Sequence, residues 1–167
     1  MRLINMLLLC LVSTAHAAWD WQDIVDVPDK YIPDVLTTEL TEVECLALNV
    51  YHEARGESVL GQQLVAQITI NRLNHDSFPS TVCGVVTQYR QFSWTHDGAN
   101  DHPYDREAYA RAYLIAVSFL LLDYEVDIHR AGLVLNYHAT SVSPDWPRLH
   151  PVFIHGNHIF YARRRDL

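Results

Sequence analysis

Lysine is almost missing from this sequence of 167 residues, where it occurs once, at Lys30. The formal net charge is −8 with histidine neutral, and the one short basic run, Arg163–Arg165, stands at the C-terminus. Nucleic-acid binding requires a basic stripe that neutralises several phosphates. The composition therefore argues against a nucleic-acid-binding protein, and it predicts that the basic run is a solvated tail.

The sequence also lacks an apolar run long enough to span a bilayer comfortably. The most apolar stretch, Leu3–Val12, follows the positive charge of Arg2 and precedes Ala15–Ala17, which has the small-x-small form of a signal peptidase site. Residues 1–17 are therefore predicted to be a cleaved signal peptide, which would direct the protein to the periplasm or the cell exterior. A retained membrane anchor is the competing interpretation.

Cysteine is scarce as well, with three in the chain. Cys10 lies in the predicted signal peptide, so a cleaved protein keeps only Cys45 and Cys83. An even pair in an exported protein favours one disulfide. Two buried free thiols are the alternative, since the sequence does not supply the geometry.

Internal repeats and low-complexity tracts are absent too, which argues against a solenoid or a long disordered tail. Hydrophobic residues make up 49% of the chain, enough for one domain with a core of its own. We expect this domain to occupy residues 38–167. Residues 18–37 are rich in aspartate and poor in apolar periodicity, which is typical of a linker or a strap laid over the domain.

Three helices are expected, over Thr41–Arg55, Val59–Leu73 and Arg106–Asp123. The first has a capping-box pattern at Thr41 and Glu44, and Gly56 would end it in a left-handed conformation. Apolar residues recur at helical spacing in all three segments, although the alternation in QITINRL also permits a strand in the second. The third segment is the most apolar and is expected to lie at the centre of the core.

The rest of the chain is expected to form loops and a small sheet. Residues 74–104 are turn-rich and are predicted to be a long loop. The stretches GLVLNYHA and NHIFYAR read as two short strands, separated by the proline-containing stretch SVSPDWPRLHP. Together the pattern predicts an α+β fold, with helices first and a small antiparallel sheet at the C-terminal end.

Glu53 is the residue whose position raises a chemical question. It lies three residues after Val50, at the border of the apolar face, and in the last helical turn, where unpaired carbonyls disfavour a carboxylate. Both features favour the neutral acid, the form that a general acid needs. The alternative is an exposed residue paired with Arg55 or Arg72, and composition and spacing alone favour it. Glu57 is interpreted as a cap of the second helix.

Several motifs in order resemble one family. They are YHEARGE, GQQLVAQITINR, FPSTVCGVVTQ, QFSWTHDG, NYHATSVSPDW and HGNHIFY, and they run from about Cys45 to Tyr161. This ordered set is similar to the cell wall hydrolases of the spore cortex-lytic (SleB) type. The cysteine pair and the lack of a separate peptidoglycan-binding repeat are closer to the Gram-negative and phage branch of that family.

The resemblance implies a lysozyme-like enzyme that cuts peptidoglycan between N-acetylmuramic acid and N-acetylglucosamine, with Glu53 as the catalytic residue and without a cofactor. A hydrolase that uses water would usually need a second carboxylate, for which Glu57 and Asp97 are the candidates. Expected partners are the glycan strands, bound by a monomer without stable membrane association. The candidate substrate-binding residues are Gln91, Phe92, Tyr137, His138, His158 and Tyr161, of which Phe92 and Tyr161 have ordinary core packing as an alternative.

Two rival functions stay open at this point. His138, His155 and His158, with Glu53 or Asp145, suggest a zinc-dependent N-acetylmuramoyl-alanine amidase, although the sequence has no HExxH helix or other tight ligand spacing. The expectation is that no metal is bound, and that His138 and His158 bond backbone or orient the glutamate. The second rival is an exported wall-binding protein without catalysis. The acidic charge predicts only weak retention on whole walls.

Overall fold

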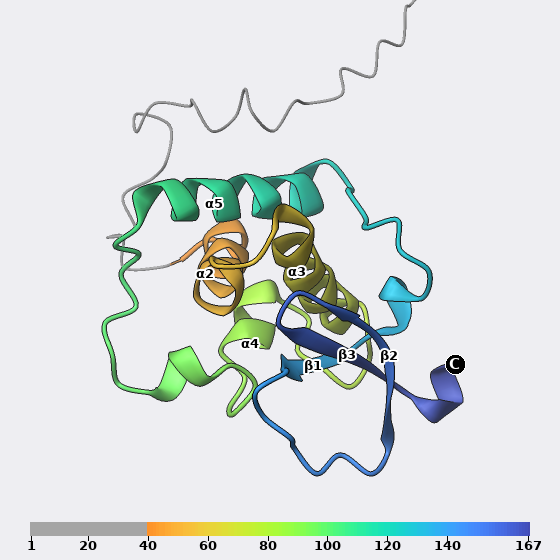
Figure 1. Cartoon of the computed structure of the whole chain (residues 1–167). Helices are drawn as coiled ribbons and strands as arrows, with labels where there is room; N and C mark the ends of the chain where they lie inside the picture. The colour runs from red at the N-terminus through yellow and green to blue at the C-terminus, as the bar shows by residue number, and fades with distance from the viewer. Residues whose placement is uncertain (1–39) are drawn as a thin grey trace, which may run out of the picture.

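The computed structural model describes residues 40–167, so the predicted signal peptide (1–17) and strap (18–37) lie outside the described residues. Four α-helices are described in this part of the chain: α2 (Glu42–Ala54), α3 (Val59–Leu73), α4 (Val82–Val86) and α5 (Arg106–Leu121). They precede a three-stranded sheet (Figure 1). The expected order of helices first and sheet last is confirmed.

Helix α2 begins as the sequence predicts and ends differently. The Thr41 hydroxyl accepts a hydrogen bond from the Glu44 amide at 3.2 Å, and the Glu44 carboxylate accepts one from the Thr41 amide at 2.7 Å. The capping box is thus confirmed. At the other end the cap residue is Arg55, in right-handed helical conformation (φ −57°), and Gly56 is not among the glycines with positive φ. The predicted left-handed stop at Gly56 is therefore wrong.

The core lies where α2, α3 and α5 meet, with α5 crossing over the other two helices (Figure 1). Apolar residues that recur at helical spacing in the three expected helices are almost fully buried here, among them Leu46, Val50, Leu64, Ile68 and Ile115. Helix α5 is shorter than expected, because the amides of Leu122 and Tyr124 both bond to the carbonyl of Ser118 and the chain turns away. Leu122, which belongs to the segment expected to form the central core helix, is 60% exposed.

The segment 74–104 was predicted to be a loop, and it contains two short helices. Thr81 caps α4 by accepting a hydrogen bond from the Gly84 amide, and a 3-10 turn, η2, covers Ser93–His96. A disulfide joins Cys45 on α2 to Cys83 on α4, which confirms the predicted pairing. The Glu42 carboxylate also accepts a hydrogen bond from the Val82 amide. These contacts hold α4 against the start of α2.

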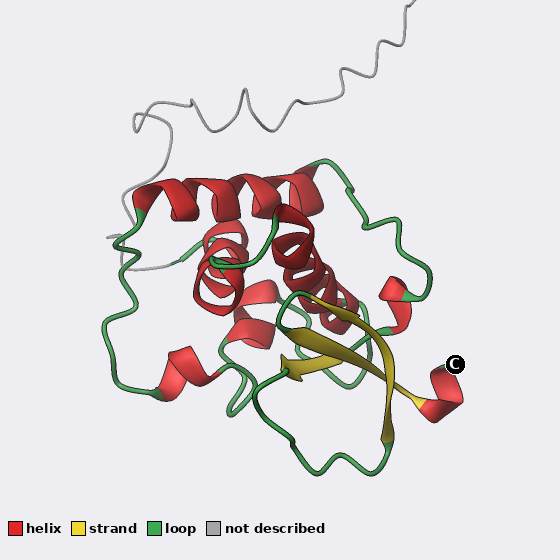
Figure 2. Cartoon of the chain, viewed as in Figure 1, coloured by secondary structure: helices red, strands yellow, loops and turns green. Residues whose placement is uncertain are grey.

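The sheet has three antiparallel strands in the order β1-β3-β2: β1 (Asn136–Ala139), β2 (Leu149–His155) and β3 (His158–Arg163) (Figure 2). The two predicted strands correspond to β1 and β3, except that Ala131–Leu133 forms a 3-10 turn. Strand β2 was missed because Pro151 interrupts the pattern. A shift of register between Pro151 and Phe153 accommodates the proline on this edge strand.

The two faces of the sheet have different surroundings. Along β3 the side chains of His158, Phe160 and Ala162 are buried, whereas those of Ile159, Tyr161 and Arg163 are only partly covered. Alternation along a strand puts these two sets on opposite faces, which we call the core face and the outer face. Within residues 40–167 no helix combines the length and apolarity needed to cross a membrane.

Candidate active site

Glu53 lies in the last turn of α2 and is half-buried against the sheet. The hydroxyl of Tyr137, on β1, donates a hydrogen bond to Glu53 Oε2 at 3.1 Å. Burial raises the pKa of Glu53 above its ordinary value, although the Tyr137 hydrogen bond and the positive charge of Arg72 act in the opposite direction. Glu53 is thus a carboxyl group whose surroundings favour the protonated form.

Arg72, in the last turn of α3, supplies the buried positive charge near Glu53. Its side chain is 3% exposed and lies over the rings of Phe78 and Phe92, 5.4 and 5.1 Å from their centroids. Its Nε donates to the carbonyl of Leu135 at 2.7 Å, just before β1. Arg72 therefore acts on Glu53 through the field of its charge, whereas the sequence suggested only a surface ion pair. The other suggested partner, Arg55, lies over the Tyr51 ring at 5.0 Å.

Tyr137 and His158 lie side by side on the core face of the sheet, where the Tyr137 hydroxyl meets Glu53. Their rings meet edge to face with centroids 5.0 Å apart, and His158 is 6% exposed. Burial lowers the pKa of His158, so the neutral ring is favoured. Burial and the nearby Glu53 raise the pKa of Tyr137, so its hydroxyl keeps its proton and stays a donor. The structure thus brings one predicted site residue, Tyr137, to Glu53 and packs a second, His158, against Tyr137.

His138 and Tyr161 are also predicted site residues, and they meet on the outer face. The His138 ring stacks on Tyr161 with centroids 5.1 Å apart, and Trp146 packs edge-on against both. His138 Nδ1 contacts the Ala139 carbonyl at 2.9 Å, so that nitrogen carries the proton, and Nε2 accepts from the Tyr161 hydroxyl at 2.9 Å. We call these three residues the aromatic platform. Trp146 was missed because no helix or strand pattern surrounds it.

Glu57 has a structural role that differs from the predicted helix cap. Ser58 caps α3 instead, and Glu57 accepts hydrogen bonds from the amide and the side chain of Asn157, at 3.2 and 2.8 Å, in the β2–β3 turn. Burial opposes the charged form, but these bonds and the nearby His158 and His155 outweigh it and lower the pKa of Glu57. Gly156 has φ +53°, a conformation that strains other residues, and a Cβ there would also displace Glu57 Oε2, which lies 1.9 Å from that position.

The remaining predicted residues lie on the loop between α4 and α5. Gln91 and Asp97 are exposed, and the Asp97 carboxylate accepts a hydrogen bond from the Ala99 amide at 2.7 Å. Phe92 is 2% exposed, which favours the core-packing alternative. The same loop carries Trp94, whose ring stacks on His52 at 4.5 Å and whose Nε1 donates to Asn49 at 3.1 Å.

A cavity of about 160 Å³ lies between this loop and the end of α2. Tyr51, His52 and Arg55 line it from α2, and Trp94 and Asp97 line it from the loop. The walls thus include neighbours of Glu53 in sequence and two groups, an indole and a carboxylate, that suit sugar faces and hydroxyls. The rest of the lining comes from Tyr104 and residues 99–102 of the loop.

The histidines proposed as zinc ligands have other contacts. The His155 Nε2 lies 2.9 Å from the Ser58 hydroxyl, and His138 is bonded to Tyr161. Among the described residues no group of three or more histidine, cysteine, aspartate or glutamate side chains has an arrangement suited to a metal ion.

Known proteins resemble this chain in sequence and in fold. The family model described as Cell Wall Hydrolase matches residues 56–161, and so begins just after Glu53. Spore cortex-lytic enzymes are similar over shorter stretches: the one from Bacillus cereus is 44% identical over 57 residues, covering 34% of this chain and 22% of that protein. The one from Oceanobacillus iheyensis is 40% identical over 74 residues, covering 44% and 24%. The chain thus aligns with less than a quarter of the length of these curated relatives.

Two solved structures resemble the fold, each with 29% sequence identity and a TM-score of 0.55. The catalytic domain of the Bacillus cereus SleB protein is matched over 94% of its length and 75% of this chain. The catalytic domain of the germination-specific lytic transglycosylase SleB from Bacillus anthracis is matched over 99% of its length and 81% of this chain. The expected lysozyme-like α+β class agrees with these neighbours. With more than half of its residues matched by the family model, the chain belongs to the cell wall hydrolase family.

Proposed function

We propose that this protein cleaves the glycan strands of peptidoglycan as a lytic transglycosylase, with Glu53 as its one catalytic carboxyl group. The observation that carries the proposal is the half-buried Glu53 at the end of α2, with its pKa raised by burial and its Oε2 held by Tyr137, in a chain of the cell wall hydrolase family. An acid that keeps its proton near neutral pH can protonate a leaving oxygen.

The mechanism needs one proton donor that later becomes an acceptor. Glu53 gives its proton to the glycosidic oxygen while the bond from the anomeric carbon of N-acetylmuramic acid to that oxygen breaks. The ring passes through an oxocarbenium-like state. The Glu53 carboxylate then takes the proton from the sugar's 6-hydroxyl, whose oxygen forms a bond to the anomeric carbon. The products are a free N-acetylglucosamine end and a 1,6-anhydro sugar, and Glu53 is protonated again.

The surroundings of Glu53 support both halves of this cycle. Burial favours the acid before bond cleavage, and the Tyr137 hydroxyl and the charge of Arg72 stabilise the carboxylate that forms afterwards. The two candidates for a second carboxylate are engaged elsewhere, Glu57 with Asn157 and Asp97 with the Ala99 amide. A reaction that depends on one carboxyl group fits this arrangement better than hydrolysis by an activated water.

The substrate sets where the protein acts. Peptidoglycan lies outside the cytoplasmic membrane, so the proposal includes export through the predicted signal at residues 1–17, into the periplasm or the exterior, and action as a monomer. The aromatic side chains near the end of α2 and on β1 would contact sugar rings, with Tyr137 and His158 on the core face. Gln91 is exposed and remains a proposed hydrogen-bonding contact.

Analysis of digested sacculi by mass spectrometry tests the proposal. We expect wild-type protein to release muropeptides that end in 1,6-anhydro-muramic acid. Reducing muramic acid ends would mean that water is the nucleophile. Freed stem peptides, lost on addition of a chelator, would support the amidase instead, and no released product would support a wall-binding protein.

Replacing Tyr137 with phenylalanine should change the pH dependence of cleavage. The Tyr137 hydrogen bond lowers the pKa of Glu53, so its loss should raise that pKa further. Because the acid works in its protonated form, activity is lost as the pH rises through the pKa, and the alkaline limb of the pH–rate profile should move up by about one pH unit. Tyr89→Phe, at an exposed tyrosine that does not line the cavity at the end of α2, is the matched control. An alkaline limb that stays in place or moves to lower pH would contradict the assignment of Glu53 as the catalytic acid.

A further inference from the structure

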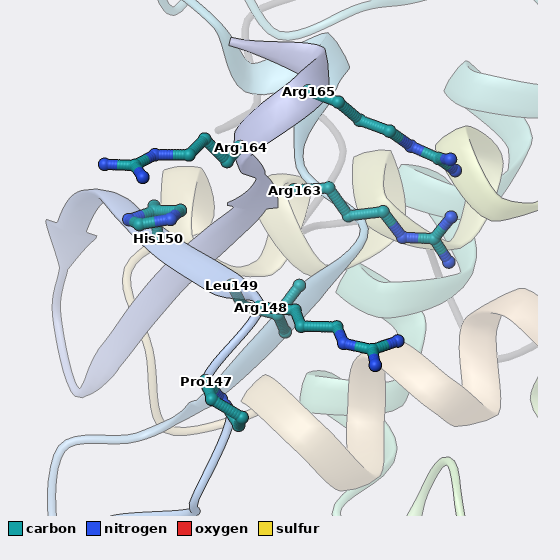
Figure 3. Close-up of a pocket in the computed structure, with 7 residues that line it drawn as sticks. All are labelled: Pro147, Arg148, Leu149, His150, Arg163, Arg164 and Arg165. Carbon is teal, nitrogen blue, oxygen red and sulfur yellow. The ribbon is translucent and has the colours of Figure 1, made fainter.

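The arginines of this acidic protein are unevenly distributed. Four of them line one cavity of about 680 Å³ at the C-terminal end of the sheet: Arg148, Arg163, Arg164 and Arg165, together with Pro147, Leu149 and His150. We call this cavity the arginine groove (Figure 3). The formal charge of the whole chain is −8, so the local charge is opposite in sign to the average. The prediction of a simple solvated tail at Arg163–Arg165 does not account for a cavity lined in this way.

The sheet brings these side chains together. Leu149, the first residue of β2, pairs with Arg163, the last residue of β3, and this places Arg148 beside Arg163. The chain then turns into a 3-10 segment, Arg164–Asp166. Figure 3 shows the guanidinium groups of Arg148, Arg163 and Arg165 extending to one side, while Arg164 lies beside His150 on the other. The groove is therefore built from two strand ends and is more than a flexible tail.

The aromatic platform adjoins the Arg163 side of the groove, on the outer face of the sheet. Tyr161 precedes Arg163 by two residues on β3, a separation of about 7 Å along one face. Trp146, whose ring packs against Tyr161 at 5.6 Å, accepts a hydrogen bond from the Leu149 amide through its carbonyl at 3.1 Å. A row of rings thus leads into a cluster of positive charges.

We propose that the outer face of the sheet binds the carboxylate-bearing peptide stems of peptidoglycan, with the arginine groove holding the carboxylates. Guanidinium groups match carboxylates in a bidentate geometry, and rings such as those of the platform suit the apolar faces of sugars. A glycan with acidic side peptides offers both groups at short spacing. The inference rests on the proposed function, because it names the part of that substrate recognised away from Glu53.

The groove lies apart from the catalytic carboxyl. Tyr137, which bonds Glu53, pairs with Phe160 on the core face, whereas Tyr161 and Arg163 belong to the outer face. Loss of the arginines should therefore change which substrate is preferred, and should leave the proton transfer at Glu53 in place. An anionic membrane offers phosphates to the same charges, but the concave shape and the adjoining rings favour a discrete peptide-bearing glycan.

The test compares the double variant Arg148→Gln/Arg163→Gln with the control Arg90→Gln/Arg130→Gln, which makes the same change in net charge at exposed arginines elsewhere. Substrates are intact glycan strands and strands stripped of their peptides by an amidase. We expect wild type and control to favour intact strands in kcat/KM by about tenfold, through KM, and the groove variant to lose this preference. The proposal would be overturned if all three proteins showed the same preference for intact strands. It would also be overturned if the groove variant lost kcat/KM equally on both substrates.

Binding measurements distinguish a failure of the groove proposal from a failure of the proposed glycosidase function. Calorimetry with a soluble tripeptide stem should give heat with wild type and about tenfold weaker binding with the groove variant, whether or not the protein cleaves glycan. If the protein binds the stem but does not cleave glycan, the result would count against the mechanism proposed for Glu53 and not against the groove. Binding of phosphatidylglycerol vesicles that depends on Arg148 and Arg163, without binding of the stem, would overturn the proposal in favour of a membrane.

Discussion

Glu53→Gln is expected to reduce the release of muropeptides by about 10²- to 10⁴-fold, the range typical of a lost general acid. Glutamine keeps the shape of the side chain and can still accept the Tyr137 hydrogen bond that Glu53 Oε2 accepts at 3.1 Å. It has no proton to give to the glycosidic oxygen and cannot take one from the 6-hydroxyl. Chromatography of the soluble products, at a pH where wild type is active, measures the loss.

The same variant should not lose stability at neutral pH. Because burial raises the pKa of Glu53 above 4.5, the folded protein binds this proton more tightly than the unfolded chain. The stability gained from this proton is fully present below the unfolded pKa and is lost as the pH rises through the folded pKa. Glutamine avoids a buried negative charge, so the variant should unfold at the same or a higher urea concentration at pH 7, and the difference should vanish below pH 4.5.

The matched control is Glu125→Gln, at an exposed glutamate, which should cleave sacculi as wild type does. Pelleting with sacculi separates catalysis from binding, since Glu53→Gln should still pellet to the weak extent expected of an acidic protein. Clearing of sacculi that survives Glu53→Gln would remove Glu53 from the mechanism. A biological effect that survives without clearing would favour a wall-binding protein.

Local patterns predicted the helices well and the surroundings of Glu53 poorly. The capping box at Thr41 and the repeat of apolar residues in α2 are properties of neighbouring residues, and both appear in the structure. The hydrogen bond to Glu53 comes from Tyr137, 84 residues away, and the nearby charge comes from the end of α3. Without the pairing of distant segments, a helix-end glutamate has no more reason to be an acid than to be a surface residue.

The sheet shows the same division between local and distant information. Strands β1 and β3 have recognisable strand composition, but β2 carries Pro151 and was read as a loop. Its strand character comes from pairing with β3, including Leu149 with Arg163. That pairing also creates the arginine groove, which composition hides because the total charge is negative.

Loss of the Cys45–Cys83 disulfide is expected to lower the free energy of unfolding by about 4 kcal/mol, from the loop entropy that the crosslink removes from the unfolded chain. The bridge spans 38 positions and ties α4 to α2. Since small domains are stable by only about 5–15 kcal/mol, the uncrosslinked protein would lie near its limit of stability. The physical reason is the freedom regained by the segment between the two helices in the unfolded state.

Urea unfolding of Cys45→Ala/Cys83→Ser, compared with wild type under oxidising and reducing conditions, measures this effect. Alanine suits the buried Cys45, which is 3% exposed, and serine suits the half-buried Cys83. Reductant should destabilise wild type and leave the stability of the variant unchanged. Without the disulfide, the free energy of unfolding should fall more steeply with urea concentration, because the open unfolded chain exposes more surface. A loss below about 1 kcal/mol would mean that other contacts restrain the unfolded loop as effectively as the bridge does.

The contact between the Glu42 carboxylate and the Val82 amide links the same two helices, so Glu42→Gln in the variant background would show how much of their docking survives without the disulfide.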